Sequence, residues 1–144
     1  MVNNSYINAY KKAENSMNSV KSSHEIIREL MFRLANSMDK IVIDINEHSN
    51  NKFDYKNISK KELALNKSKN MSKSLSIIYG LQTCLDFDKS PEIAGNLFQL
   101  YEFARQKVIS SFTKKDANGI NQAIAVIREI LAGWQSIPLE ERKL

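Results

Sequence analysis

The stretch SSHEIIRELMFRLANSMDKIVIDINEH, residues 22–48, decides the fold. Ser22 and Glu25 have the spacing of a capping box, in which each side chain satisfies a backbone N–H that the first helical turn leaves unpaired. Apolar residues then recur at steps of three and four, and these are Ile26, Ile27, Leu30, Leu34, Met38, Ile41 and Ile45. The stretch therefore predicts a long amphipathic helix whose apolar side needs partners of the same kind.

Three further stretches repeat this pattern and predict helices at about 59–86, 90–113 and 116–136. Each start carries a cap signal, which is Ser59 with Glu62, Ser90 before Pro91, and Asp116. The expected stripes are Leu63, Met71, Leu75, Ile78, Leu81 and Leu85; Ile93, Leu97, Leu100, Tyr101, Ala104, Val108 and Phe112; and Ile120, Ile124, Ile127, Leu131 and Trp134. Lys67 interrupts the first of these three stripes.

Four amphipathic helices joined by short connections predict an all-α, antiparallel, up-down four-helix bundle over residues 22–137. Residues 1–21 are polar and are expected to form a short, partly ordered N-terminal arm, and residues 138–144 are expected to form a charged, flexible tail. Gly80, Gly95 and Gly133 fall inside helical patterns, where each costs up to about 1 kcal/mol relative to alanine. We favour close helix packing as their reason over an open place where another chain lies.

The net charge of +5 is concentrated in one region. Seven lysines stand between Lys52 and Lys73 against two acidic residues, whereas the rest of the chain is neutral. Such a cluster is more often a solvated face than a binding site, although it also suits nucleic acid or an acidic partner. The single cysteine, Cys84, cannot form an internal disulfide, is expected to be a small buried hydrophobe, and fits a cytoplasmic location.

The sequence contains no motif that brings together the residues needed for catalysis. Neither His24 nor His48 follows a glutamate by three residues, which argues against a carboxylate-bridged metal pair, and one cysteine with two histidines does not make a zinc site. The glycines are too scattered for a phosphate loop, and a catalytic thiol at Cys84 would need a base that the sequence does not reveal. No stretch approaches the about 20 apolar residues that membrane insertion requires. We therefore expect a binding protein with no catalytic residues, metal or cofactor.

The segment Gly80–Tyr101, GLQTCLDFDKSPEIAGNLFQLY, resembles the L-D-x-x-x-G-x-E-I-A-x-N-L-x-x-L-Y segment of the FliS family of flagellin-specific export chaperones. The sequence YINAY at Tyr6–Tyr10 resembles the tyrosine-bearing arm of that family, and Trp134-Gln135 resembles its A-W-K ending. The chain departs from the family at Pro91, which replaces a common glycine, and at Met31–Leu34.

The resemblance implies a helical, cytoplasmic chaperone that binds the disordered C-terminal segment of flagellin, prevents its premature polymerisation and delivers it to the flagellar export apparatus. It implies an arm bearing Tyr6, Ile7 and Tyr10 that covers an apolar groove and docks at the export gate, and a homodimer through exchange of this arm is a further expectation. Candidate residues for the client groove are Ile27, Leu30, Asn96, Leu97 and Tyr101. The alternative hypothesis is a basic helical adaptor or nucleic-acid-binding bundle that uses the Lys52–Lys73 cluster.

Overall fold

The computed structural model describes residues 7–9, 22–49, 60–114 and 117–138. These residues contain helices and no strand, which confirms the all-α prediction for this part of the chain. After a short helical stretch at residues 7–9, the long helices are α2 (Ser23–Ser49), α3 (Lys60–Thr83), α4 (Pro91–Lys114) and α5 (Ala117–Gln135). The predicted caps at Ser59 and Asp116 and the connection between α2 and α3 lie outside the described residues.

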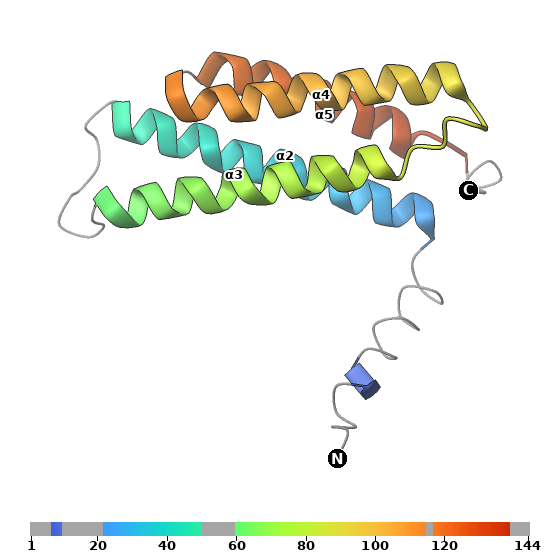
Figure 1. Ribbon diagram of the computed structural model, residues 1–144, viewed down its shortest axis with the longest axis horizontal. Coiled ribbons are helices and arrows are strands. Elements are labelled where there is room, and N and C mark those ends of the chain that lie inside the picture. The colour runs from blue at the N-terminus through green and yellow to red at the C-terminus, as the bar shows by residue number, and fades with distance from the viewer. Residues whose placement is uncertain (1–6, 10–21, 50–59, 115–116, 139–144) are drawn as a thin grey trace.

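The four long helices pack as a ring of neighbours around one core. Helix α2 packs against α3 and α5, and α4 packs against the same two helices, so α2 and α4 occupy opposite corners. Figure 1 shows that the chain reverses direction from each long helix to the next. The start of α2 and the end of α5 therefore lie at the same end of this helical body.

The core is built from one stripe of each helix. It contains Met31, Leu34, Ala35, Met38, Ile41, Ile45, Met71, Ile78, Leu81, Tyr101, Ala104, Val108, Ile120, Ala123, Ile124, Ile127 and Leu131. Most of these side chains fall on the stripes that the apolar periodicity predicts. Burial of such side chains at about 1.5–3 kcal/mol each supplies the main driving force for assembling the helices.

Local hydrogen bonds explain where the helices begin. Ser22 Oγ accepts from Glu25 N at 3.2 Å, which confirms the cap that starts α2. Between α3 and α4, Asp86 Oδ1 accepts from the backbone N–H groups of Asp88 at 3.0 Å and Lys89 at 3.1 Å. This turn ends at Ser90, whose carbonyl accepts a hydrogen bond from Ala94 N at 2.9 Å in the first turn of α4. The short side chain of Asp86 thus fixes the reversal that sets α4 beside α3.

Cys84 is exposed, which corrects the expectation of a buried hydrophobe. Helix α3 ends at Thr83, and its end is closed by bonds to the Gly80 carbonyl from Thr83 Oγ1 at 3.0 Å and from Cys84 N at 3.2 Å. The helical period that would have placed Cys84 near the core stops before it.

The three glycines inside helices do not serve close packing, and that expectation is wrong. A Cβ built on Gly80, Gly95 or Gly133 would meet nothing within 4 Å. Only Gly119 of the helical glycines has a close neighbour, with Lys107 Cδ at 3.0 Å from its ideal Cβ position. The open space beside the other three means that another chain can approach the helix backbone there.

Replacing Gly80 or Gly95 by alanine is expected to raise the free energy of unfolding by about 0.5–1 kcal/mol at each position, because alanine lowers the entropy of the unfolded chain and meets no obstruction. Urea unfolding followed by circular dichroism measures the change. Gly119→Ala, whose new methyl group would press on Lys107, is the matched control and should gain less. Destabilisation by Gly95→Ala would contradict the open space described above.

Candidate functional site

Helix α4 carries an apolar row on the side that faces α5. Ile93, Leu97 and Leu100 follow one another at steps of four and three residues, which places them on one side of the helix. Leu97 is half-buried against the core, whereas Ile93 is 61% exposed and Leu100 is 38% exposed. Asn96, the other residue expected on this side, is exposed. The predicted stripe of α4 is therefore wider than the side that the core covers.

The adjacent side of α5 is apolar next to this row, and at Gly133 it has no side chain. Helices α4 and α5 run antiparallel, and Lys107 of α4 lies against Gly119 of α5. Gly133 is 14 residues further along α5, and Ile93 is 14 residues before Lys107 on α4. Gly133 and Ile93 therefore lie at the same level of the helix pair. Gly133 is exposed with open space beside it, and Ile130 is partly buried against the core. We call this surface the α4–α5 strip, formed by Ile93, Leu97, Leu100, Ile130 and Gly133.

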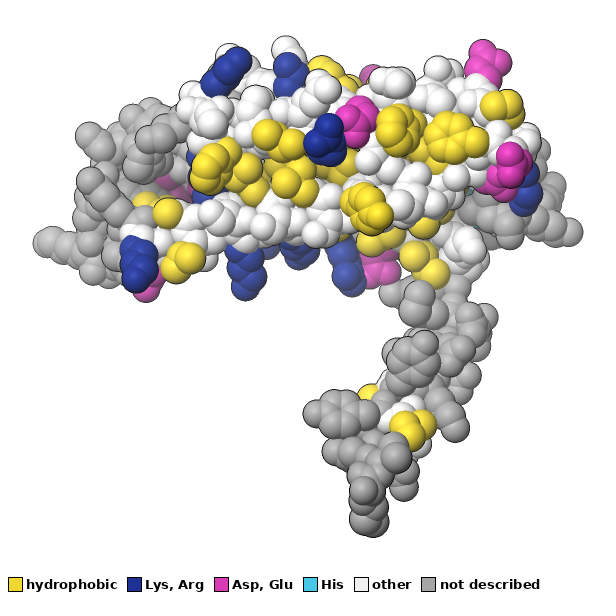
Figure 2. All heavy atoms as spheres, viewed as in Figure 1, with side chains coloured by type: hydrophobic (Ala, Val, Ile, Leu, Met, Phe, Trp, Pro, Cys, Tyr) yellow, Lys and Arg dark blue, Asp and Glu magenta, His cyan; other side chains and the backbone are white. Residues whose placement is uncertain are grey.

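A second apolar surface lies on the opposite side of α4, towards α3. Figure 2 shows apolar side chains gathered along the face formed by these two helices. The exposed apolar residues there are Leu65, Tyr79, Phe87, Ile109 and Phe112. Phe87 contacts Phe98 edge to face with ring centroids 6.3 Å apart, and Lys67 Nζ lies 5.8 Å from the centroid of the Phe112 ring. We call this surface the α3–α4 face.

A polar link divides the α3–α4 face. Gln82 Nε2 donates to Glu102 Oε1 at 2.9 Å, and Arg105 donates to both carboxylate oxygens of Glu102 at 2.8 Å. The hydrogen bonds from Arg105, followed by that from Gln82, lower the pKa of Glu102 to about 2. A charged, fully bonded group of this kind is costly for an apolar ligand to cover. The α4–α5 strip has no such interruption between Ile93, Leu97 and Leu100.

The remaining groove candidates lie apart from the α4–α5 strip. Ile27 and Leu30 are half-buried against the core on α2, the corner opposite α4. Tyr101 is only 3% exposed and its ring belongs to the core. Of the arm residues, Ile7 is 40% exposed, while Tyr6 and Tyr10 lie outside the described residues.

Burial of Tyr101 changes the pKa of its hydroxyl group, and this change can be measured through the stability of the fold. Desolvation, followed by the nearby Cys84, raises the pKa of Tyr101 from 10.0 to about 12. When the pKa of a group is higher in the folded state than in the unfolded state, the group stabilises the fold fully at pH values below the unfolded-state pKa. This stabilisation is lost as the pH rises through the folded-state pKa.

Between pH 10 and 12 the free energy of unfolding should therefore fall, and Tyr101→Phe should reduce that fall by about 2 kcal/mol. Urea unfolding at pH 9 and at pH values up to about 12 measures it. Tyr79→Phe, at a ring that is 70% exposed, is the matched control. Equal slopes for wild type and Tyr101→Phe across this pH range would refute the assignment.

The described ranges, 7–9, 22–49, 60–114 and 117–138, also bear on metal and membrane sites. These residues contain no group of three or more His, Cys, Asp or Glu side chains that is arranged to hold a metal ion. No helix among them is both long and apolar enough to cross a membrane.

Comparison with known proteins identifies the family of this chain. The family model described as flagellar protein FliS matches residues 6–141. The chain belongs to the FliS family. A flagellar secretion chaperone FliS from Vibrio cholerae is 30% identical over 139 residues, which is 96% of this chain and 92% of the relative.

Two shorter matches give the same family. FliSB of Pseudomonas aeruginosa is 33% identical over 67 residues, covering 46% of this chain and 53% of the relative. FliS of Salmonella typhimurium is 32% identical over 72 residues, covering 49% and 53%. All three relatives are named flagellar secretion chaperones, which agrees with the expectation of a chaperone and not of an enzyme.

The FliS segment recognised in the sequence, Gly80–Tyr101, forms the end of α3, the turn and the first half of α4. It thus supplies Ile93, Leu97 and Leu100, which are the whole α4 side of the α4–α5 strip. Sequence reasoning assigned Ile93 and Leu100 to the core stripe and missed their exposure. The signal that pointed to an open surface there was the helical glycine Gly133.

Proposed function

We propose that this FliS-family protein is a cytoplasmic chaperone for flagellin export, built as an antiparallel four-helix bundle. In this proposal it binds the disordered C-terminal segment of flagellin, prevents premature polymerisation and delivers the segment to the flagellar export apparatus. Family membership supports the general role, and the α4–α5 strip supports the mode of binding.

The observation that carries the proposal is the row of apolar side chains on the α4–α5 strip, which is exposed at Ile93 and Leu100. Ile93 and Leu100 flank the half-buried Leu97, and Gly133 leaves room for a second backbone beside them. A helix that presents apolar residues at i, i+3 or i+4, and i+7 fits such a row. Asn96, exposed at its margin, is available to hydrogen bond with the client.

A client that orders on binding suits the task of export. Folding of the bound segment into helix offsets much of the contact free energy, so the complex is specific but reversible. The half-buried Ile27 and Leu30 on α2 extend the proposed client contact to a second corner, as a long segment wrapped around the bundle would require.

The N-terminal arm provides a cover for the apolar surface in the absence of client. We propose this role for Tyr6, Ile7 and Tyr10, with docking at the export gate and arm exchange between two copies as further roles. An exposed apolar strip is an aggregation hazard, and a displaceable cover removes it.

The nucleic-acid alternative has less support from the contacts of the lysine cluster. Lys67 does not project into solvent, because it lies over Phe112 and donates to the Ser111 carbonyl at 3.4 Å. Lys52 and Lys56 lie outside the described residues.

The direct experiment is titration of the full chain with the C-terminal segment of the flagellin encoded in the same genome. Calorimetry should give a one-to-one complex, and circular dichroism should show helix formed on mixing. The N-terminal segment of the same flagellin is the control and should not bind. Absence of a complex with the C-terminal segment, and with intact flagellin on co-elution, would refute the proposal.

A further inference from the structure

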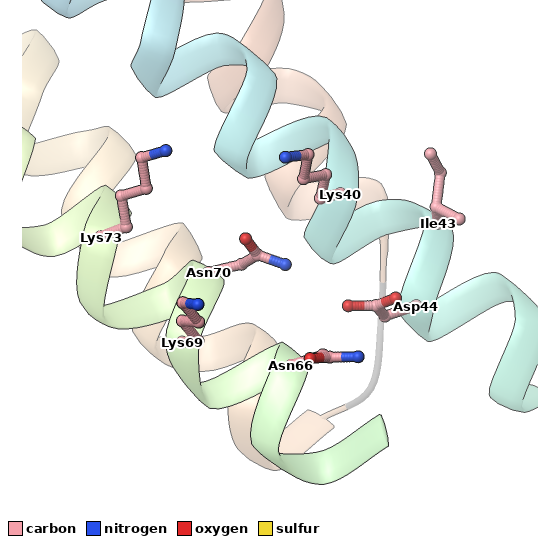
Figure 3. A pocket seen from close by; sticks show the side chains of 7 residues that line it. All are labelled: Lys40, Ile43, Asp44, Asn66, Lys69, Asn70 and Lys73. Carbon is pink, nitrogen blue, oxygen red and sulfur yellow. The ribbon is translucent and has the colours of Figure 1, made fainter. Parts of the chain in front are cut away.

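A hollow of about 430 Å³ lies between α2 and α3, on a surface that neither apolar region includes. It is lined by Lys40, Ile43, Asp44, Asn66, Lys69, Asn70 and Lys73. Figure 3 shows Lys40 from α2 and Lys73 from α3 extending towards the space between the helices, with Asp44 and Asn70 directed into it and Ile43 pointing away.

The hollow carries excess positive charge. Within the described residues Lys40, Lys69 and Lys73 form no ion pair, and Asp44 is the only acidic residue of the lining. Three ammonium groups around one space repel each other, and an anionic ligand relieves that repulsion. The lining therefore selects a ligand with more than one negative charge.

The other groups in the hollow distinguish a peptide from a nucleic acid. Asp44 Oδ2 is buried, and the Asp44 carboxylate opposes phosphates and carboxylates alike, so it does not separate the two ligands. Asn66 and Asn70 offer both donors and acceptors, and Ile43, 52% exposed, offers an apolar contact at the rim. No aromatic side chain lines the hollow to stack on a base.

The spacing of the lysines indicates the shape of the ligand. Lys69 and Lys73 are four residues apart on α3, a rise of about 6 Å along the helix axis. Carboxylates four residues apart on a second helix have the same spacing. Seven residues beyond Lys73 on the same side of α3, Gly80 leaves open space in which a second backbone can lie.

We propose that the hollow between α2 and α3 is a docking site for an acidic helical segment of a second protein. Two of its carboxylates, four residues apart, pair with Lys69 and Lys73, and a third pairs with Lys40. An apolar side chain of the segment covers Ile43, which is 52% exposed. This site is separate from the α4–α5 strip and does not depend on the client assigned there.

The test uses a fluorescent model helix of about 20 residues, alanine-rich and bearing glutamates at i, i+4 spacing, long enough to be helical alone. Anisotropy at low salt measures its binding to the full chain. The triple variant Lys40→Ala, Lys69→Ala, Lys73→Ala should bind about tenfold more weakly or worse. These lysines are exposed, so the thermal unfolding of the variant should match wild type.

The matched control is the triple variant Lys61→Ala, Lys89→Ala, Lys114→Ala. It removes the same three charges, taking the net charge from +5 to +2, from exposed positions outside the hollow. Its affinity should change by less than about twofold. Equal loss in both triple variants would overturn the proposal, because attraction to net charge would then explain the binding.

Two further probes separate this site from its rivals. An isomer of the model helix with the same glutamates moved to adjacent positions should bind more weakly, and equal binding would overturn the proposed register. A DNA duplex should not displace the model helix from the full chain, and displacement would assign the hollow to nucleic acid instead.

Discussion

Replacement of Trp134 by alanine is expected to lower the free energy of unfolding by about 3 kcal/mol. Trp134 and His24 join the end of α5 to the start of α2 through two reciprocal hydrogen bonds. His24 Nε2 lies 2.7 Å from the Trp134 carbonyl, and Trp134 Nε1 donates to the His24 carbonyl at 2.9 Å. The two rings are stacked, with centroids 5.0 Å apart and planes 9° from parallel.

The geometry sets the tautomer of His24. A carbonyl oxygen only accepts, so Nε2 carries the hydrogen in this contact. Nδ1 is buried without a hydrogen-bond partner. Loss of the indole removes the stacked ring and the hydrogen bond to the His24 carbonyl, so the cost combines lost packing with a lost hydrogen bond.

Trp134→Phe separates these two terms, because phenylalanine keeps an aromatic ring beside His24 but has no N–H to donate. It should cost about 1 kcal/mol, clearly less than alanine. Urea unfolding gives both values, and amide hydrogen exchange should localise the loss to the first turns of α2. A change of less than about 0.5 kcal/mol for Trp134→Ala would show that this contact does not stabilise the fold.

The helices and their buried sides were predictable because caps and apolar periodicity act within one helix. Ser22, Pro91 and the stripe from Leu34 to Ile45 required no knowledge of a partner. The contact between His24 and Trp134 was not predictable in this way, since the two residues are 110 positions apart and neither bears a local signal.

The exposed sites show a second limit of sequence reasoning. Periodicity identifies the apolar side of a helix but not the width that its neighbours cover, so Ile93, Leu100 and Phe112 appeared as core and lie at the surface. The prediction of close packing at Gly80, Gly95 and Gly133 failed for the same reason, because a residue without a side chain suits a close packing contact and an open surface equally. Asn96 and Leu97 were expected at the exposed margin of the α4 stripe, and in the structure Asn96 is exposed and Leu97 is half-buried.

Ile93→Asp is expected to weaken binding of the flagellin C-terminal segment by about 30-fold while leaving the fold intact. Ile93 is 61% exposed, so a charge there costs the free protein little. In the proposed complex the same side chain is covered by the client helix, and burial of an unpaired carboxylate is strongly unfavourable. Loss of one central apolar anchor typically costs about 2 kcal/mol or more, which corresponds to the expected factor.

Ile109→Asp is the control that makes this test specific, because Ile109 lies on the same helix with a similar exposure of 45% but belongs to the α3–α4 face. It places the same charge on the opposite side of α4 and should change the affinity by less than about threefold. Calorimetry with each variant separates the two surfaces. A client bound to the α3–α4 face would reverse the result, but it would have to cover the charged link of Gln82, Glu102 and Arg105. The continuous row of Ile93, Leu97 and Leu100 requires no such desolvation, and for this reason the larger loss is expected at Ile93.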